Sequence, residues 1–149
     1  MAISRRPDWL KIRLASSSAY KAVREIIEEQ DLHTVCRSAR CPNIGDCWSR
    51  KTATFMILGD VCTRNCRFCA VSKGPVQVVD PEEPLRVARA IQKLGLKHAV
   101  ITSVTRDDLD DGGSSSFVEI VRQIRQLAPR CSIELLIPDF QGNIAALND

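Results

Sequence analysis

The chain has 149 residues, of which 44% are hydrophobic and 26% charged, and its formal net charge is +3. That composition indicates a globular domain with a hydrophobic core, and so small a charge gives no sign of binding to nucleic acid or to a membrane surface. Because no apolar run approaches the roughly 18 residues that span a bilayer and the N-terminus lacks the pattern of a signal peptide, we expect a cytoplasmic protein that binds neither a membrane nor nucleic acid.

The N-terminal third combines a basic segment, a helix and an irregular stretch. The basic side chains at 5–13 are interpreted as a solvated surface segment. Residues 16–30 predict an amphipathic helix, because apolar residues such as Val23 and Ile27 recur at helical spacing. Residues 33–50 show no periodicity and are rich in Cys, Pro, Asn and Gly, so we expect a loop that bound metal keeps ordered.

The middle of the chain predicts a strand, a helix and a second strand. Residues 52–58 form an apolar, β-prone run typical of a buried strand. The helix that follows is expected to have Asp80 as its N-cap, Pro81 as its first residue and Gly95 as its C-terminal cap. A second strand is expected at 98–103. The apolar positions expected to face the core from the helix are Leu85, Ala88, Ile91 and Leu94.

The last third continues the alternation of strands and helices. An aspartate-rich loop at 104–113 precedes a helix at 115–128, whose first turn carries a predicted capping box of Ser116 and Glu119. A strand at 132–137 and the start of another helix at 142–148 follow.

This order predicts an α/β fold with a parallel sheet covered by helices. In such folds, active sites lie at the carboxyl ends of the strands. The cysteines that follow the strand at 52–58 and the loop at 104–113 both come at such ends, so both are expected to line the catalytic mouth.

Seven cysteines are many for a chain of this length. In a reducing compartment, clustered cysteines more often bind metal or do redox work than form disulfides. Six of them form two groups of three, and the isolated Cys131 is interpreted as a small buried hydrophobic residue. The first triad is Cys36, Cys41 and Cys47, and the second triad is Cys62, Cys66 and Cys69. Structural zinc sites and simple cubane clusters take four protein ligands, so three thiolates would leave one metal position open, which is a catalytic arrangement.

Several side chains near the triads have both a functional and a structural interpretation. Arg64 and Arg67 would favour thiolates in the second triad, or are simply solvated charges. Phe68 would shield a bound cluster from water, or is a packing residue. Trp48 is expected to pack beside the first triad. His33 is a possible extra ligand there, although a loop histidine more often is not one.

The cysteine-containing segments resemble known families. Cys62-Thr-Arg-Asn-Cys66-Arg-Phe-Cys69 is similar to the Cys-x3-Cys-x2-Cys signature of radical S-adenosylmethionine enzymes. The segment at 34–48, with the first triad, resembles the auxiliary-cluster motif of the lipoyl synthase family. Segments at 6–11, 53–59 and 104–113 resemble the same family, so the resemblance covers essentially the whole chain.

This resemblance implies a radical mechanism. The family inserts two sulfur atoms into an octanoyl chain on a lysine of a carrier domain, such as the glycine-cleavage H protein or the E2 subunits of 2-oxoacid dehydrogenases. A 4Fe–4S cluster on the second triad would bind S-adenosylmethionine through its open iron and, with an electron from a donor such as ferredoxin or flavodoxin, generate a 5′-deoxyadenosyl radical. A second 4Fe–4S cluster on the first triad would give up the sulfur. The residues with these implied roles are Cys62, Cys66 and Cys69 for catalysis and S-adenosylmethionine binding, and Cys36, Cys41 and Cys47 for the auxiliary cluster.

The family also implies a fold and a domain division. We expect a partial (β/α) barrel of the radical S-adenosylmethionine type, truncated after about three βα units. Residues 1–51 would form an N-terminal extension with a helix and the auxiliary-cluster loop, and residues 52–149 the first part of the barrel. The family's C-terminal serine ligand has no counterpart in this sequence, so the chain is expected to be a fragment.

Three alternatives stay open at this point. One is a zinc-stabilised, non-enzymatic interaction module that uses cysteines of both triads. Another is a different radical S-adenosylmethionine sulfurtransferase. The third is an inactive fragment that keeps its clusters.

Overall fold

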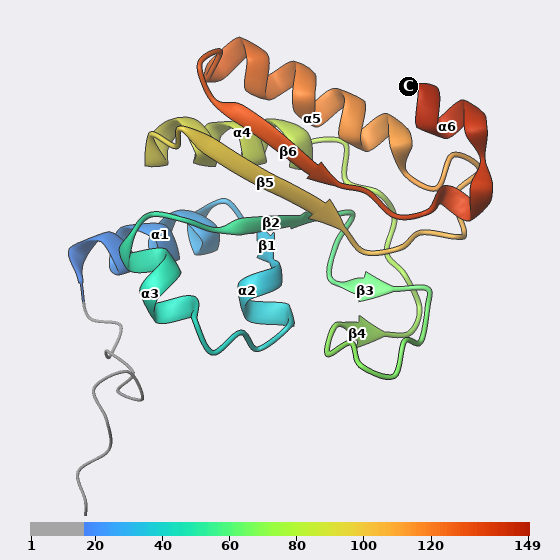
Figure 1. Cartoon of the computed structure of the whole chain (residues 1–149), viewed down its shortest axis with the longest axis horizontal. Helices are drawn as coiled ribbons and strands as arrows, with labels where there is room; N and C mark the ends of the chain where they lie inside the picture. Colours follow the sequence, from blue (N-terminus) through green and yellow to red (C-terminus); the bar gives the residue numbers. More distant parts are fainter. Residues whose placement is uncertain (1–16) are drawn as a thin grey trace, which may run out of the picture.

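Three parallel strands form the centre of the structure, a computed structural model that describes residues 17–149 (Figure 1). They are β2 (Thr54–Ile57), β5 (His98–Ser103) and β6 (Ser132–Leu136), and β1 (His33–Thr34) adds an antiparallel edge beside β2. The order in the sheet is β1-β2-β5-β6. The predicted parallel sheet is confirmed, and it does not close into a barrel within the described residues. The basic segment at 5–13 and the family-like segment at 6–11 lie outside them.

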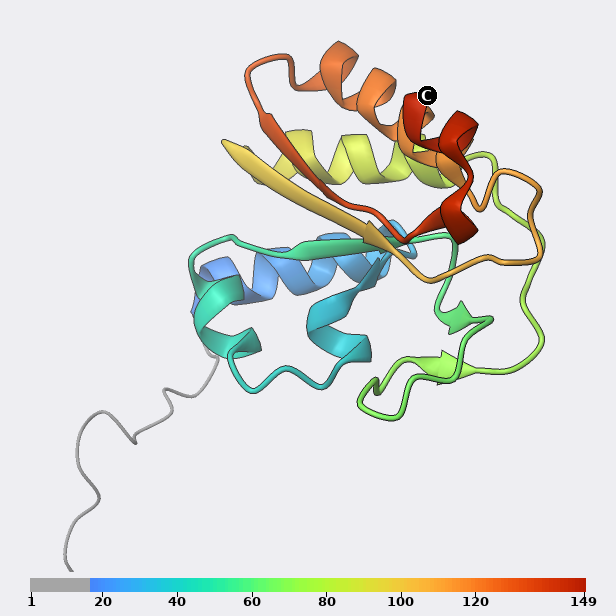
Figure 2. The same ribbon diagram turned by 45° about the vertical axis from the view of Figure 1, so that its right-hand side comes forward.

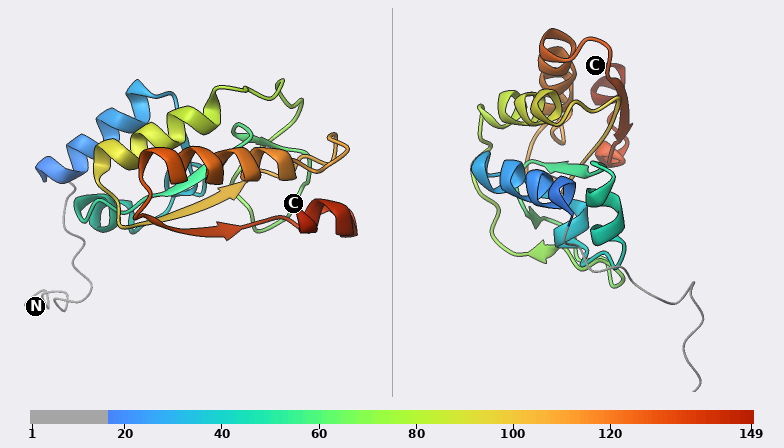
Figure 3. Two further views of the ribbon diagram at one scale, coloured as in Figure 1. Left: turned by 90° about the horizontal axis from the view of Figure 1, so that it is seen from above. Right: turned by 90° about the vertical axis from the view of Figure 1, so that its left-hand side faces the viewer.

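Helices cover one face of this sheet. α1 (Ser18–Glu29), α4 (Glu83–Leu94) and α5 (Ser114–Leu127) lie side by side over it (Figure 3). The strands turn fully buried side chains such as Phe55 and Ile101 into the core, and the helices contribute Ile91 and Ile120. Because consecutive parallel strands need a crossover, each helix that follows a strand returns the chain to the amino end of the sheet.

The stretch at 33–50 is more regular than the sequence predicted. It contains α2 (Val35–Ser38) and α3 (Ile44–Ser49) as well as β1. Thr34, which is fully buried, caps α2 by accepting a hydrogen bond of 3.3 Å from the Arg37 N–H. Helices of four and six residues show no apolar stripe, so periodicity alone could not reveal them.

Two helix starts also differ from the prediction. The helix expected after Asp80 begins at Glu83. The Asp80 carboxylate accepts a hydrogen bond of 2.8 Å from the Glu82 N–H, and this bond belongs to a turn that precedes the helix. The capping box on α5 is wrong: Asp111, not Ser116, accepts backbone N–H groups of the first turn. The Gly95 cap is confirmed, with φ of +64°. In α4, Leu85 is half-buried, and Val87 takes a place in the core.

The carboxyl ends of the three parallel strands point to one end of the molecule (Figure 2). A small second sheet, β3 (Val61–Cys62) with β4 (Ser72–Lys73), lies at this end. After β6 the chain forms the 3-10 turn η2 (Phe140–Gly142) and the short helix α6 (Ile144–Asn148). No helix among residues 17–149 is both long and apolar enough to cross a membrane.

Candidate metal centre

The second triad lies on one loop at the carboxyl end of the sheet. After β2, Gly59 with φ of +88° turns the chain into β3, where Cys62 pairs with Lys73 of β4. Within the cysteine loop, residues 62–69, the Cys66 carbonyl accepts hydrogen bonds from the Cys69 N–H at 3.2 Å and from Lys73 Nζ at 3.3 Å. The expected position past the end of the first long strand is therefore what the structure shows.

The aspartate-rich loop at 104–113 holds the start of the cysteine loop. Both the backbone N–H and the hydroxyl of Thr63 donate to the Thr105 carbonyl, at 3.1 and 3.0 Å. The Thr63 hydroxyl oxygen in turn accepts from the Asp107 N–H at 3.2 Å. The two loops that the sequence placed at the same mouth are thus in direct contact.

Arg64 is enclosed by two carboxylates. Its guanidinium donates to both oxygens of Asp107, at 2.7 and 2.8 Å, and to both oxygens of Asp139, at 2.7 Å each. Hydrogen bonding to Arg64 lowers the pKa of Asp139 to about 2 and also lowers the pKa of Asp107. The positive charge of Arg64 is therefore paired with these carboxylates, and neither interpretation from the sequence, a charge that favours thiolates or a solvated charge, included this pairing.

The other side chains of the loop face solvent. Phe68 is 95% exposed, so the interpretation of it as a packing residue is wrong, and its role as a cover for a bound cluster stays a prediction. Arg67 and Cys66 are exposed too, while Cys62 and Cys69 are half-buried.

The first triad spans two short helices. Cys36 is on α2, Cys41 follows it, and Cys47 is on α3. The Cys36 carbonyl accepts from the Cys41 N–H at 3.0 Å, and the Cys47 carbonyl accepts from the Thr52 N–H at 2.9 Å. All three thiols are free and half-buried.

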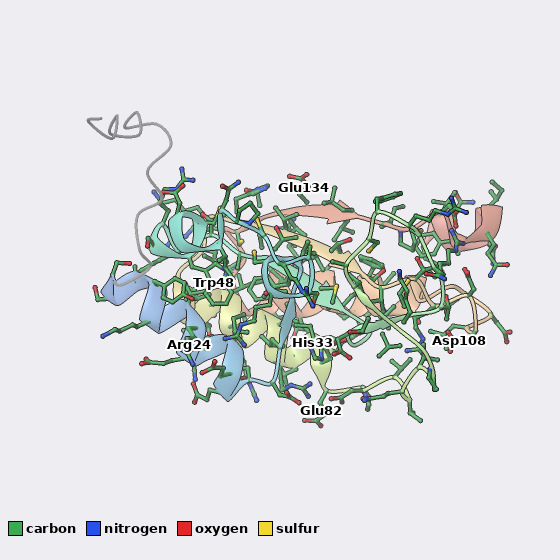
Figure 4. The ribbon with its side chains drawn as sticks, turned by 90° about the horizontal axis from the view of Figure 1, so that it is seen from below. Arg24, His33, Trp48, Glu82, Asp108 and Glu134 are labelled. Atoms are coloured by element: carbon green, nitrogen blue, oxygen red, sulfur yellow. The ribbon has the colours of Figure 1, made fainter. Side chains whose placement is uncertain are left out.

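Trp48 anchors the segment that carries the first triad. It is fully buried, its ring centroid lies 5.4 Å from that of Tyr20 on α1, and the Arg37 guanidinium lies 5.3 Å above it. Figure 4 places it toward the end of the molecule away from Asp108. The expected packing role is therefore confirmed, and it ties α1, α2 and α3 together.

No group of three or more His, Cys, Asp or Glu side chains converges on a single-ion site in the described part of the chain. His33 lies on β1 and does not complete one. An iron–sulfur cluster, however, spreads its thiolate ligands over separate irons. Each triad provides three free thiols on one short segment, and this set of donors fits an iron–sulfur cluster.

Sequence reasoning missed a buried carboxylate beside the site. Glu83 is 6% exposed, and it accepts a hydrogen bond of 2.8 Å from the Leu58 N–H where β2 ends. Burial raises the pKa of Glu83, against the lowering effects of hydrogen bonds from the Leu58 and Gly59 N–H groups. Its position four residues before Val87, on the apolar stripe of α4, is the signal that could have identified it.

A polar hollow adjoins the Arg64 partners. Its volume is about 420 Å³, and the loops after β5 and β6 line it with residues that include Asp107, Asp110 and Gln141. A larger hollow of about 690 Å³ lies at the amino ends of the strands, beside Cys131 and Lys97. None of the six triad cysteines lines either hollow.

Comparison with known proteins agrees with this geometry. The model of the radical SAM superfamily matches residues 56–147, which include the cysteine loop and all three parallel strands except the first residues of β2.

Similar curated proteins extend the match over nearly the whole chain. The chain is 54% identical over 144 residues to the lipoyl synthase of Roseiflexus sp. strain RS-1, which covers 97% of this chain and 48% of that protein. It is 56% identical over 142 residues to the lipoyl synthase of Rubrobacter xylanophilus, covering 95% and 44%. The lipoyl synthase of Symbiobacterium thermophilum is 56% identical over 145 residues, covering 97% and 45%. The chain thus spans about half the length of the curated relatives it matches.

Proposed function

Because the chain belongs to the radical SAM superfamily, we propose that it carries the cluster-binding part of a lipoyl synthase, which inserts two sulfur atoms into a protein-bound octanoyl chain. The observation that carries the proposal is 54% to 56% identity to lipoyl synthases over at least 95% of the chain. The activity of the whole enzyme is part of the proposal, since the chain spans about half of those relatives.

In this proposal each triad holds one 4Fe–4S cluster. The cysteine loop, through Cys62, Cys66 and Cys69, holds the cluster that binds S-adenosylmethionine. The first triad, in the proposed extension at 1–51, holds the auxiliary cluster, and residues 52–149 form the start of the barrel. When bound, the first of these groups supplies one-electron cleavage of S-adenosylmethionine and the second supplies sulfur.

The protein's own residues position these groups. Thr63 and Arg64 fix the cysteine loop to the ends of β5 and β6. Trp48 and Thr34 order the two short helices that present the first triad. A C–H bond of a saturated chain has no acidic proton, so an acid–base pair of side chains could not activate it.

The proposed partners follow from the same function. They are octanoylated carrier domains, such as the glycine-cleavage H protein and the E2 subunits of 2-oxoacid dehydrogenases, and an electron donor such as ferredoxin or flavodoxin. We propose the cytoplasm as the location. The name of the relatives supports this choice of substrate.

Metal content tests the proposal most directly. The chain is purified and reconstituted without oxygen, and iron, acid-labile sulfide and zinc are counted per polypeptide. Parallel samples carry alanine at all three positions of one triad, and Cys131→Ala is the matched control because that thiol is buried away from both triads.

Two portions of iron and sulfide, each lost with its own triad and unaffected by Cys131→Ala, are the expected result. An assay for sulfur insertion into an octanoylated carrier then follows. Stoichiometric zinc with little sulfide would overturn the proposal in favour of a non-enzymatic interaction module.

A further inference from the structure

The cysteine loop has little hydrophobic packing to anchor it. No residue from 61 to 80 is buried, and Phe68, the largest apolar side chain of the loop, is almost fully exposed. Within this stretch only Cys62, Val71 and Val79 pack against the core, and each does so partly buried. Polar contacts therefore supply much of what positions the cysteine loop.

Arg64 provides the strongest of these contacts. A guanidinium has five N–H donors, and Arg64 uses four of them in two bidentate pairs, with Asp107 and Asp139. Bidentate pairs of this kind are stronger and more directional than a single charged contact. The two carboxylates also repel each other, which raises the pKa of Asp107 against the lowering by Arg64, so only the cation between them makes the arrangement favourable.

The ion pairs of Arg64 with Asp107 and Asp139, called the clamp from here on, connect three separate βα units. Arg64 lies between Cys62 and Cys66, while its partners lie 43 and 75 residues further along the chain. Asp107 follows β5, and Asp139 follows β6. The Asp139 carboxylate is itself oriented, because it accepts the Gln141 N–H at 3.0 Å.

We propose that Arg64, held by Asp107 and Asp139, is a positioning residue that sets where the cysteine loop presents its thiols at the mouth of the sheet. Its relevance to a bound cluster rests on the proposed function, whereas its effect on the loop does not. Lysine cannot replace it, because an ammonium group on a flexible stem cannot engage both carboxylates in a plane.

The first test uses the chain without iron. Hydrogen exchange is measured at the N–H groups of Thr63 and Asp107, both of which bond between the two loops. Arg64→Met, Arg64→Lys and Asp139→Asn are compared with Arg67→Met, which removes a charge from the same loop at an exposed position that makes no ion pair among residues 17–149.

Exchange at both amides should rise about tenfold or more in Arg64→Met and Arg64→Lys, less in Asp139→Asn, and stay unchanged in Arg67→Met. Amides in the centre of β5 report whether a variant is folded. If Asp139→Asn and Arg64→Met both exchange like the unchanged chain, or if Arg67→Met has the same effect as they do, the clamp does not position the loop.

The second test measures cluster retention. In a background with alanine at the first triad, the rate of iron loss to a chelator and the electron paramagnetic resonance spectrum with S-adenosylmethionine are recorded. Replacing residues that support metal ligands typically costs 10- to 100-fold in affinity, so iron loss should be about tenfold faster in Arg64→Lys than in Arg67→Met, with an altered spectrum. Equal rates and spectra would overturn the proposal, and failure of the unchanged chain to bind iron would overturn the proposed function alone.

Discussion

The Glu83 carboxylate, in the first turn of α4, accepts a hydrogen bond of 2.8 Å from the backbone N–H of Leu58 at the end of β2. Leu58 and the next residue, Gly59, have φ of +66° and +88°. A leucine adopts this region only at a cost, so its surroundings must hold it there. The turn that leads into the cysteine loop is therefore fixed by a side chain 25 residues away.

Replacing this acceptor should destabilise the fold. Glu83→Ala leaves the buried Leu58 N–H without a partner, which costs about 1–3 kcal/mol of unfolding free energy. Urea unfolding at neutral pH measures the loss. The neighbouring Glu82 is exposed, so Glu82→Ala should stay within about 0.5 kcal/mol, and equal losses in the two variants would contradict this role for Glu83.

The same carboxylate predicts a pH dependence. Burial raises the pKa of Glu83 above its ordinary value of 4.5, so the folded state favours the protonated form. The stabilisation of the folded state by this protonated carboxyl group is complete when the pH is below the pKa of Glu83 in the unfolded chain. It is lost as the pH rises through the pKa of Glu83 in the folded chain. Relative to Glu83→Gln, the unchanged chain should therefore lose stability from about pH 4 upward. Urea unfolding of both at stepped pH checks this, and a difference that is constant or of opposite slope would refute it.

Gly113 brings the start of α5 against the end of β2. A Cβ added there would collide with Leu58 Cδ1, and φ is +92°. Gly113→Ala should cost more than the roughly 1–3 kcal/mol of backbone strain alone. Gly95→Ala is the matched control, because φ is also positive, +64°, but no atom lies within 4 Å of the added Cβ. Thermal unfolding compares them, and equal losses would mean that Leu58 moves aside freely.

Thr34 is predicted to stabilise the first triad's segment. Thr34→Ala removes the hydroxyl that caps α2, at a cost of about 0.5–2 kcal/mol. Thr34→Ser keeps the hydroxyl and should retain most of that stability. The comparison is made by urea unfolding and by iron bound in a background with alanine at the second triad. Equal losses in the two variants would assign the effect to packing of the methyl group and not to the cap.

The unpaired edge of β6 is predicted to cause self-association of the protein. Leu136, the last residue of the strand, is 50% exposed, and Ile137 directly after it is 45% exposed. The strand forms the edge of the sheet in the described residues. Unpaired edges with apolar side chains associate readily. Leu136→Lys should lower light scattering at high protein concentration. Val78→Lys, at a position 94% exposed but outside the strands, should have little effect, and an equal reduction would point to net charge as the cause.

The long elements and the identity of the cysteine ligands could be predicted from the sequence. The strand at 98–103 and the helix at 16–30 were recognised because apolar periodicity and helix caps are local properties of a few consecutive residues. The grouping of the second triad could also be predicted, because Cys62, Cys66 and Cys69 lie within eight residues and therefore share one loop independently of the rest of the fold. The short helices α2 and α3 were missed, because they are too short to show apolar periodicity and because Trp48 holds α3 through contacts with Tyr20 on α1 and Arg37 on α2.

Only the tertiary structure decided which charges meet. From the sequence, Arg64 was interpreted either as a charge that favours the thiolates or as a solvated charge, yet it binds Asp107 and Asp139. Glu82 and Glu83 are adjacent and identical in type, yet one is exposed and the other buried. The physical reason is that local pattern fixes a residue's element and face, whereas its partner depends on how parallel strands far apart in the chain bring their carboxyl ends together.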